Sequence, residues 1–444
     1  MIDLSPLAAT IILILGLLIP IMLGFPVFYA CGGIALIVGL LSYGPGIPQI
    51  FYGQLIGIVS NYIFLAVPLF VFMGTMTQQA GVADRLFEAL YLWMGRLRGG
   101  LAVITIIMGT ILAACVGIVT ASVIMLGMIA LPEMINRGYN KSLATGAVCG
   151  ASTLGILIPP SVMLVVYGPN AQLSVGKLFA AAFMPGFLLA GLYMIYVTIR
   201  AYLFPEEAPA IPPAEVRVPL SRKITLLLTS VMPPAFLVLS VLGVIYFGVA
   251  SPTEAAAVGA FASIILPAAY RTLTWESLKK AVFETIKVTG VVGTMAIGAM
   301  VYVSVFLGLG GGKVITDIIL AFPLGRWGVF AMIMFIVFIM GFFMDWLGIV
   351  FILIPILSPI IPKLGFDPLW VAMMIIVNFQ TSFMTPPFCP TIFVLVPILK
   401  PEWGISGGDL IRGVWPYVAL ILVALALCVA FPQIILWLPS TMVK

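Results

Sequence analysis

The 444-residue sequence contains no histidine and little charge, since Asp, Glu, Lys and Arg make up only 8% of it. Without histidine, imidazole metal ligands and histidine acid–base catalysis are both excluded. The five cysteines stand singly in apolar segments with no CxxC pair, which is typical of small packing residues rather than disulfides or metal ligands. The net charge of +5 fits basic cytoplasmic loops better than nucleic-acid binding.

Hydrophobic residues are abundant instead: they make up 63% of the sequence, and the mean hydropathy is +1.26. Runs such as LAATIILILGLLIPIMLG reach the roughly 18 apolar residues that indicate a spanning helix. The composition therefore predicts an all-α polytopic membrane protein. The N-terminal MIDLSPLAAT has no basic region and no cleavage motif, so we expect an uncleaved first helix.

The most polar stretch, residues 204–223, predicts a cytoplasmic linker between two membrane halves, 1–203 and 224–444. Comparing the halves at an offset of about 227 residues aligns one glycine and several prolines. The pairs are Gly16 with Gly243, Pro132 with Pro359, Pro159 with Pro386, Pro160 with Pro387 and, with one residue of slip, Pro26 with Pro252. These pairs indicate an internal repeat; the alternative is chance alignment of apolar sequence.

We expect each half to contain five spans and one hairpin. The predicted spans are 7–24, 26–43, 51–76, 144–170, 178–200, 224–248, 252–270, 287–309, 369–398 and 413–438. The stretches 101–131 and 327–357 are each too long for one span and too short for two, so each predicts a re-entrant helical hairpin.

The basic residues predict the orientation of these spans. With both termini periplasmic and each hairpin returning to its own side, fifteen Lys and Arg residues lie inside and five outside, as the positive-inside rule requires. The five outside are Lys177, Lys313, Arg326, Lys363 and Lys444. Five crossings per half make the halves opposite in direction, which is the inverted repeat associated with alternating-access transporters.

Both halves place Pro-Pro inside a long apolar stretch, in ASTLGILIPPS (151–161) and NFQTSFMTPPF (378–388). A proline removes a backbone donor and frees a carbonyl, which in a membrane is tolerated where it is buried in protein or lines a wet cavity. The pattern predicts two unwound transmembrane helices whose freed groups bind an ion near the midplane. The candidate residues are Ser152, Thr153, Gly155, Pro159, Pro160, Asn378, Gln380, Thr381, Thr385, Pro386 and Pro387.

Neutral oxygen ligands such as Ser152, Thr153, Gln380 and Thr381 suit sodium, a hard and weakly bound cation. The alternative interpretation is a pair of proline kinks in which these hydroxyls bond back to helix carbonyls.

The hairpins carry polar tips, with Gly117, Thr120 and Ser122 in the first and Asp345 and Gly348 in the second. Asp345 is an acid deep in apolar sequence, which makes it a candidate functional residue. Three roles are open: sodium ligand, proton carrier, or partner in a structural contact.

Two amphipathic stretches, 81–100 and 274–287, predict interfacial arm helices; solvated loop helices are the alternative.

At these motifs the sequence resembles the large membrane subunit of a tripartite ATP-independent periplasmic (TRAP) transporter, over essentially the whole chain. The resemblance rests on ASTLGILIPPS followed by VVYG, GVASPTEAAAVGA at 248–260 and AVPLFVFMGTMTQQAG at 66–81. It implies a sodium-driven importer in the bacterial inner membrane with an elevator mechanism. It also implies two partners, a small four-helix membrane subunit and a periplasmic solute-binding protein that delivers a small organic acid.

Carried over by motif, the resemblance implies that Gly117 to Ser122 and Asp345 to Gly348 form the tips, and that Ser152 to Pro160 and Asn378 to Pro387 form the unwound helices. Together they would enclose sodium and substrate. The first tip departs from the family pattern, because GIVTAS has fewer hydroxyls than the Ser-rich tip of many relatives. This departure puts the first sodium ligands in doubt.

Three other functions compete with this one. A membrane enzyme would need histidine or paired carboxylates, and a channel would need a continuous polar pore. A standalone divalent-anion/sodium-type symporter is the alternative nearest to the proposed function. Neighbouring reading frames for a small membrane protein and a binding protein would favour the tripartite interpretation.

Overall fold

The computed structural model describes residues 4–94, 97–212, 218–321, 323–386 and 388–442. Within these ranges every regular element is a helix, which confirms the all-α fold class. Eight described helices are long and apolar enough to cross a membrane, or nine if one bent pair counts as a span. The chain is therefore a multi-pass membrane protein.

The helices of the first half follow the predicted order. They are α1 (Pro6–Met22), α2 (Val27–Tyr43), α3 (Ile47–Val59), α4 (Ala66–Gln79), α5 (Val82–Met94), α6 (Gly100–Val116), α7 (Val119–Asn136), α8 (Lys141–Leu157), α9 (Val162–Ala171) and α10 (Val175–Leu203). Local signals set several starts: the Ser5 side chain accepts from Ala8 N at α1, and Asn140 caps α8.

The second half repeats this series of elements. Its helices are α11 (Leu220–Tyr246), α12 (Pro252–Ala269), α13 (Trp275–Gly308), α14 (Gly311–Ala321), α15 (Gly325–Met340), α16 (Trp346–Leu357), α17 (Pro368–Met384), α18 (Pro390–Leu395), α19 (Gly407–Ala430) and α20 (Gln433–Ser440). Ser251 and Glu254 form a capping box at α12, and Ser406 and Asp409 form another at α19.

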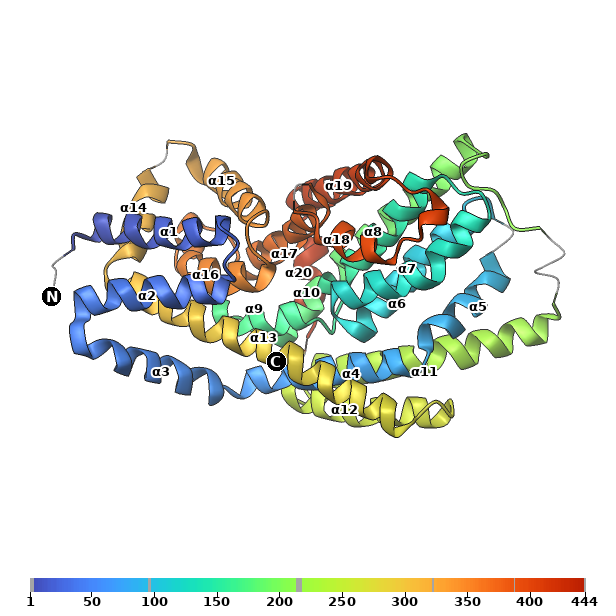
Figure 1. The fold of residues 1–444 in the computed structure, drawn as a ribbon, viewed down its shortest axis with the longest axis horizontal. Coiled ribbons are helices and arrows are strands. Elements are labelled where there is room, and N and C mark those ends of the chain that lie inside the picture. Colours follow the sequence, from blue (N-terminus) through green and yellow to red (C-terminus); the bar gives the residue numbers. More distant parts are fainter. Residues whose placement is uncertain (1–3, 95–96, 213–217, 322, 387, 443–444) are drawn as a thin grey trace.

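The spacing of about 227 residues recurs in the element bounds. Adding it to the bounds of α8, 141 and 157, gives 368 and 384, which are the bounds of α17. The hairpin helices α6 and α7 correspond in the same way to α15 and α16. In Figure 1 the two hairpins lie on opposite sides of the molecule, with α17 and α10 between them. The exact division into 1–203, 204–223 and 224–444 stays a prediction.

The predicted span 51–76 is wrong, because this segment is broken. Helix α3 ends at Val59, a short 3-10 helix covers Tyr62–Leu65, and α4 then begins at Ala66. Asn61 accepts a hydrogen bond from Ile63 N at 3.0 Å, a local bond that competes with helix continuation.

The matching segment of the second half is one 34-residue helix, α13. The interpretation of 274–287 as a separate arm helix is therefore wrong. Thr274 and Ser277 form a capping box that starts α13, and no glycine or proline follows before Gly290 to interrupt it. The other predicted arm, 81–100, contains α5.

Two further boundaries differ from the prediction. The predicted span 413–438 is interrupted, because α19 ends at Ala430 and α20 begins at Gln433; Pro432 between them cannot donate to the helix. The two hairpins also differ in packing: α6 and α7 pack together against α8, whereas α15 packs on α17 and α16 packs on α13 and α9.

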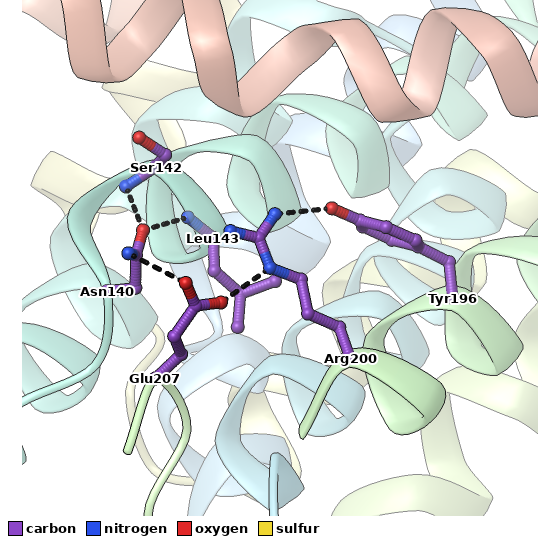
Figure 2. A network of polar contacts seen from close by, with 6 residues as sticks. All are labelled: Asn140, Ser142, Leu143, Tyr196, Arg200 and Glu207. Carbon is purple, nitrogen blue, oxygen red and sulfur yellow. Dashed lines mark hydrogen bonds and ion pairs between the residues drawn. The ribbon is translucent and has the colours of Figure 1, made fainter. Parts of the chain in front are cut away.

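Part of the predicted linker is fixed to the first half by the network in Figure 2. The Glu207 carboxylate accepts from Arg200 Nε at 2.6 Å and from Asn140 Nδ2 at 3.3 Å. Arg200 Nη1 donates to the Tyr196 hydroxyl at 2.7 Å. One carboxylate therefore joins the end of α10 to the start of α8.

Backbone bonds continue this attachment. Asn140 N donates to Glu207 O at 2.8 Å, and Gly99 N donates to Ala208 O at 3.0 Å. The Asn140 side chain accepts from Ser142 N and Leu143 N, which caps α8 (Figure 2). The linker is thus attached to α6, α8 and α10 at one end of the first half.

Close packing of α8 on α19 generates a prediction about stability. A Cβ at Gly146 would overlap the backbone carbonyl of Gly413, whereas a Cβ at Gly191 in α10 meets nothing within 4 Å. We expect Gly146→Ala to destabilise the protein by about 1–3 kcal/mol, because neither backbone can move aside easily. Gly191→Ala should be neutral or stabilising by roughly 0.5–1 kcal/mol, because alanine favours helices. The measurement is thermal unfolding in detergent; equal midpoints for the two variants would contradict this packing.

Candidate functional site

A cavity of about 280 Å³ lies where both hairpin tips and both broken helices converge. The first tip contributes Gly117 to Thr120, and the second contributes Asp345 to Leu347. The long helix α13 forms a further wall. The remaining lining residues are Ile156, Val162, Phe383 and Pro390 from the broken helices and Lys287, Val288, Val291 and Val292 from α13. The tips and breaks that the sequence singled out therefore surround one space.

The first break separates α8 from α9. These helices bend by 43° across residues 158–161, and Ile158 has an extended backbone. The Pro159–Pro160 peptide bond is cis. The Ser161 hydroxyl donates to the Ile156 carbonyl oxygen at 2.8 Å, so a carbonyl near the end of α8 keeps a partner. This bond satisfies a backbone acceptor that would otherwise be buried without a hydrogen bond.

At the second break, a hydroxyl from beyond the break again donates to a carbonyl near the helix end. Helix α17 ends at Met384, and the Thr391 hydroxyl donates to the Phe383 carbonyl oxygen at 3.1 Å. Phe383 stands 227 residues after Ile156, so the equivalent carbonyl in each half receives a hydroxyl from beyond its break. Pro386 lies in the turn of this break, and Pro387 lies outside the described residues.

The first tip packs directly on the first break. Gly117 has a φ of +65°, a conformation that favours glycine, and a Cβ there would meet the Pro160 carbonyl oxygen at 2.9 Å. A Cβ at Gly155 would meet the Ser122 hydroxyl at 3.4 Å. The Ser122 hydroxyl donates to Ile118 O at 3.2 Å, and Thr120 is exposed on the cavity wall.

In the second tip, Asp345 precedes α16 as its N-cap residue without a side-chain capping bond. Its half-buried carboxylate faces the cavity beside Trp346. Gly348 points elsewhere, because a Cβ there would meet Val27 of α2 at 3.2 Å. Asp345 to Leu347 of the predicted second tip therefore line the cavity, and Gly348 does not.

The helix-embedded candidates are absent from the lining of this cavity. Ser152 donates to Val148 O at 2.7 Å. Thr153 lies within hydrogen-bonding distance of Gly150 O, at 2.9 Å, and of Gln380 Oε1, at 3.0 Å. Thr153 and Gln380 are 227 residues apart, so equivalent positions of the two halves meet where α8 and α17 pack together. Gln380 Nε2 is buried without a partner.

Asn378 is the candidate on α17 that bonds to α15. Asn378 Nδ2 donates to Met334 O at 2.8 Å, and the neighbouring Ser382 hydroxyl donates to Phe338 O of the same helix at 3.3 Å. Thr381 donates to Asn378 O at 2.6 Å, and Thr385 donates to Thr381 O at 2.7 Å. Asn378, Thr381 and Thr385 line a separate apolar groove of about 590 Å³ between α15, α17 and α19.

The charged residues that line the cavity are Asp345 and Lys287. The sequence interpretation assigned Lys287 to a cytoplasmic segment at the start of a span and so missed it as a site residue. Lys287 is the last charged residue before the uncharged stretch 288–308 of α13, and the sequence carries no other signal for it. Lys287 Nζ lies 2.8 Å from Glu284 Oε1.

The donor set limits the chemistry of the site. In the part of the chain that the structure describes, no group of three or more His, Cys, Asp or Glu residues is placed to hold a metal ion. The cavity lining instead offers the hydroxyl of Thr120, the carboxylate of Asp345 and the ammonium group of Lys287. This set can bind a hard monovalent cation and a small anion.

Comparisons with known proteins agree with this architecture. The family described as "Tripartite ATP-independent periplasmic transporter, DctM component" matches residues 12–434. A C4-dicarboxylate TRAP transporter large permease protein of Pseudomonas aeruginosa is 32% identical over 86% of this chain and 87% of its own length. An ectoine/5-hydroxyectoine TRAP transporter large permease protein of Ruegeria pomeroyi is 29% identical over 97% of this chain and 98% of its own.

A solved structure shares the fold. The YdaH transporter of Alcanivorax borkumensis, described as having an unusual topology, superposes with a TM-score of 0.63 at 15% identity. The match covers 96% of this chain and 99% of that chain.

The contact between Thr153 and Gln380 can be tested by a double-mutant cycle. Thr153→Val removes the hydroxyl and leaves the buried amide of Gln380 without this partner, which we expect to cost about 1–3 kcal/mol. Gln380→Leu removes the amide itself. The double variant should lose less stability than the sum of the two, with a coupling of roughly 0.5–3 kcal/mol in thermal unfolding. Strictly additive losses would show that the two side chains do not interact.

Proposed function

We propose a function from the premise that this chain belongs to the DctM component family of tripartite ATP-independent periplasmic transporters. In this proposal, the chain is the membrane subunit through which a small organic acid enters the cell together with sodium. The observation that carries the proposal is the single cavity bordered by both hairpin tips and both broken helices. Such a chain is a transporter subunit and not an enzyme.

The proposed substrate class follows from the relatives and from the charges at the cavity. The two relatives are named for a C4-dicarboxylate and for ectoine, which both carry a carboxylate group. The cavity offers the ammonium group of Lys287, the hydroxyl of Thr120 and apolar side chains to a molecule of that kind. Much of the selectivity is expected to reside in the binding protein rather than in this chain.

Sodium is proposed as the coupling ion and is cargo rather than a resident cofactor. Both breaks and both tips border the cavity, and Asp345 supplies a carboxylate there. A site with a single carboxylate suits a cation that must bind and leave during each cycle. Ser152, Thr153, Gln380 and Thr381 remain candidate ligands through hydroxyl and amide lone pairs that their present hydrogen bonds leave free.

Transport is proposed to follow an elevator type of alternating access, which the inverted repeat supports. The proposed partners are a small four-helix membrane subunit and a periplasmic solute-binding protein. The proposed location is the bacterial inner membrane with both termini periplasmic.

Reconstitution in liposomes tests this function. The chain, the small subunit and the binding protein are combined, and uptake of labelled organic acids is followed with and without a sodium gradient. We expect uptake to require sodium and the binding protein together. Uptake without the binding protein would favour a standalone divalent-anion/sodium-type symporter, and uptake driven by a proton gradient would overturn the sodium assignment.

Asp345→Asn tests the coupling site in the same assay. We expect at least a tenfold loss of sodium-dependent uptake, because the substitution removes the carboxylate from the cavity. Asp317→Asn on α14 is the matched control, since Asp317 is exposed and lies outside the cavity lining. Equal uptake by both variants would exclude Asp345 from coupling.

A further inference from the structure

Lys287 occupies an unusual place for a lysine in this chain. It lies on α13, twelve residues beyond Trp275 and about 18 Å along the helix axis. The next residues on its face, Val288, Val291 and Val292, line the cavity with it. A lysine within a spanning helix is unfavourable unless it faces water, a partner or a ligand.

The opposite wall of the cavity comes from other elements. Thr120 belongs to the first tip, and Asp345 belongs to the second. The cavity therefore presents a carboxylate on its tip side and an ammonium on its α13 side. A cation bound near Asp345 and an anion bound near Lys287 would each meet a charge of opposite sign and would neutralise one another.

The contacts of Lys287 leave its ammonium available. Its ion-pair partner is Glu284, one turn earlier on the same helix, and the Lys287 side chain is 68% exposed. Glu284 is absent from the cavity lining. An exposed i,i+3 pair of this kind is worth little, so an incoming carboxylate can replace Glu284 at the ammonium at small cost.

We propose that Lys287 binds the carboxylate of the transported acid, so that α13 supplies the anion-binding group of the cavity. The proposal rests on the function proposed above, since it requires an anionic substrate. The flexible stem of lysine suits a group that must reach a small mobile anion and release it again. The tips then serve the cation, and the α13 wall serves the acid.

Two other roles for Lys287 predict different behaviour. A lysine that only pairs with Glu284 would contribute to stability and not to substrate affinity. A lysine that only extends toward lipid headgroups would be insensitive to the substrate. Substitutions on either side of the ion pair separate these roles from anion binding.

The test uses the purified full chain with its small subunit in detergent and sodium. Succinate and ectoine are the probes, and the readout is the concentration that gives half-maximal thermal stabilisation. We expect Lys287→Gln to raise this concentration about tenfold or more, because a charge-assisted hydrogen bond is lost, and Lys287→Arg to restore most of the affinity. Sodium-dependent uptake in liposomes should fall in parallel.

Two control variants accompany these substitutions. Lys280→Gln removes an exposed lysine two turns earlier on α13, outside the cavity lining, and should leave affinity unchanged. Glu284→Gln removes the partner of Lys287 and should leave the affinity unchanged or improve it.

The outcomes separate this inference from the proposed function. Equal affinity in wild type and Lys287→Gln, or an equal loss of affinity in Lys287→Gln and Glu284→Gln, would overturn the inference alone. Binding of the acid without sodium-dependent uptake in the wild type would overturn the proposed function and leave the anion site standing. If neither binding nor uptake of any anionic probe occurs, both are overturned.

Discussion

The arrangement of this protein depends on one constraint, that a backbone carbonyl freed inside a membrane must find a partner within the protein. Two helices are broken by Pro-Pro, and in both a hydroxyl from beyond the break reaches the equivalent carbonyl, from Ser161 to Ile156 and from Thr391 to Phe383. Because these bonds are local, the breaks can border a cavity without support from distant elements. The hairpin tips then close on a backbone that is already satisfied.

Close contact between the two halves depends on small residues and on one polar pair. Gly146 of α8 lies against the carbonyl of Gly413 in α19, and Gly150 lies against the ring of Tyr417. Deeper in the same region, Thr153 and Gln380 join α8 to α17 by a hydrogen bond. In an apolar medium such contacts replace the hydrophobic effect as the source of helix association.

The sequence alone predicted much of this arrangement, because proline acts on the backbone locally. The Pro-Pro pairs, the repeat spacing and the apolar hairpins are visible without any knowledge of packing, and α8 and α17 lie where these signals placed them. The failures have a common cause. Whether 274–287 ends at a membrane surface or continues as α13 depends on tertiary surroundings, so Lys287 was placed at the cytoplasmic end of a span and not at the site.

The hydrogen-bond partners of the polar candidates could not be predicted from the sequence either. Ser152 bonds back within its own helix, Thr153 reaches Gln380, and Asn378 reaches the carbonyl of Met334. Spacing places such residues near a break but does not say which neighbour each one faces. The pairing of Thr153 with Gln380 follows from the approach of two repeats, which is a property of the whole fold.

The attachment of the linker limits how far the two halves can separate. Glu207 and Ala208 are bonded to the ends of α6, α8 and α10, and Ile211 is buried. The eight-residue step from Ile211 to Pro219 can span at most about 29 Å, because a chain extends by no more than about 3.6 Å per residue. Any displacement of one half relative to the other is limited by the distance that this segment can span.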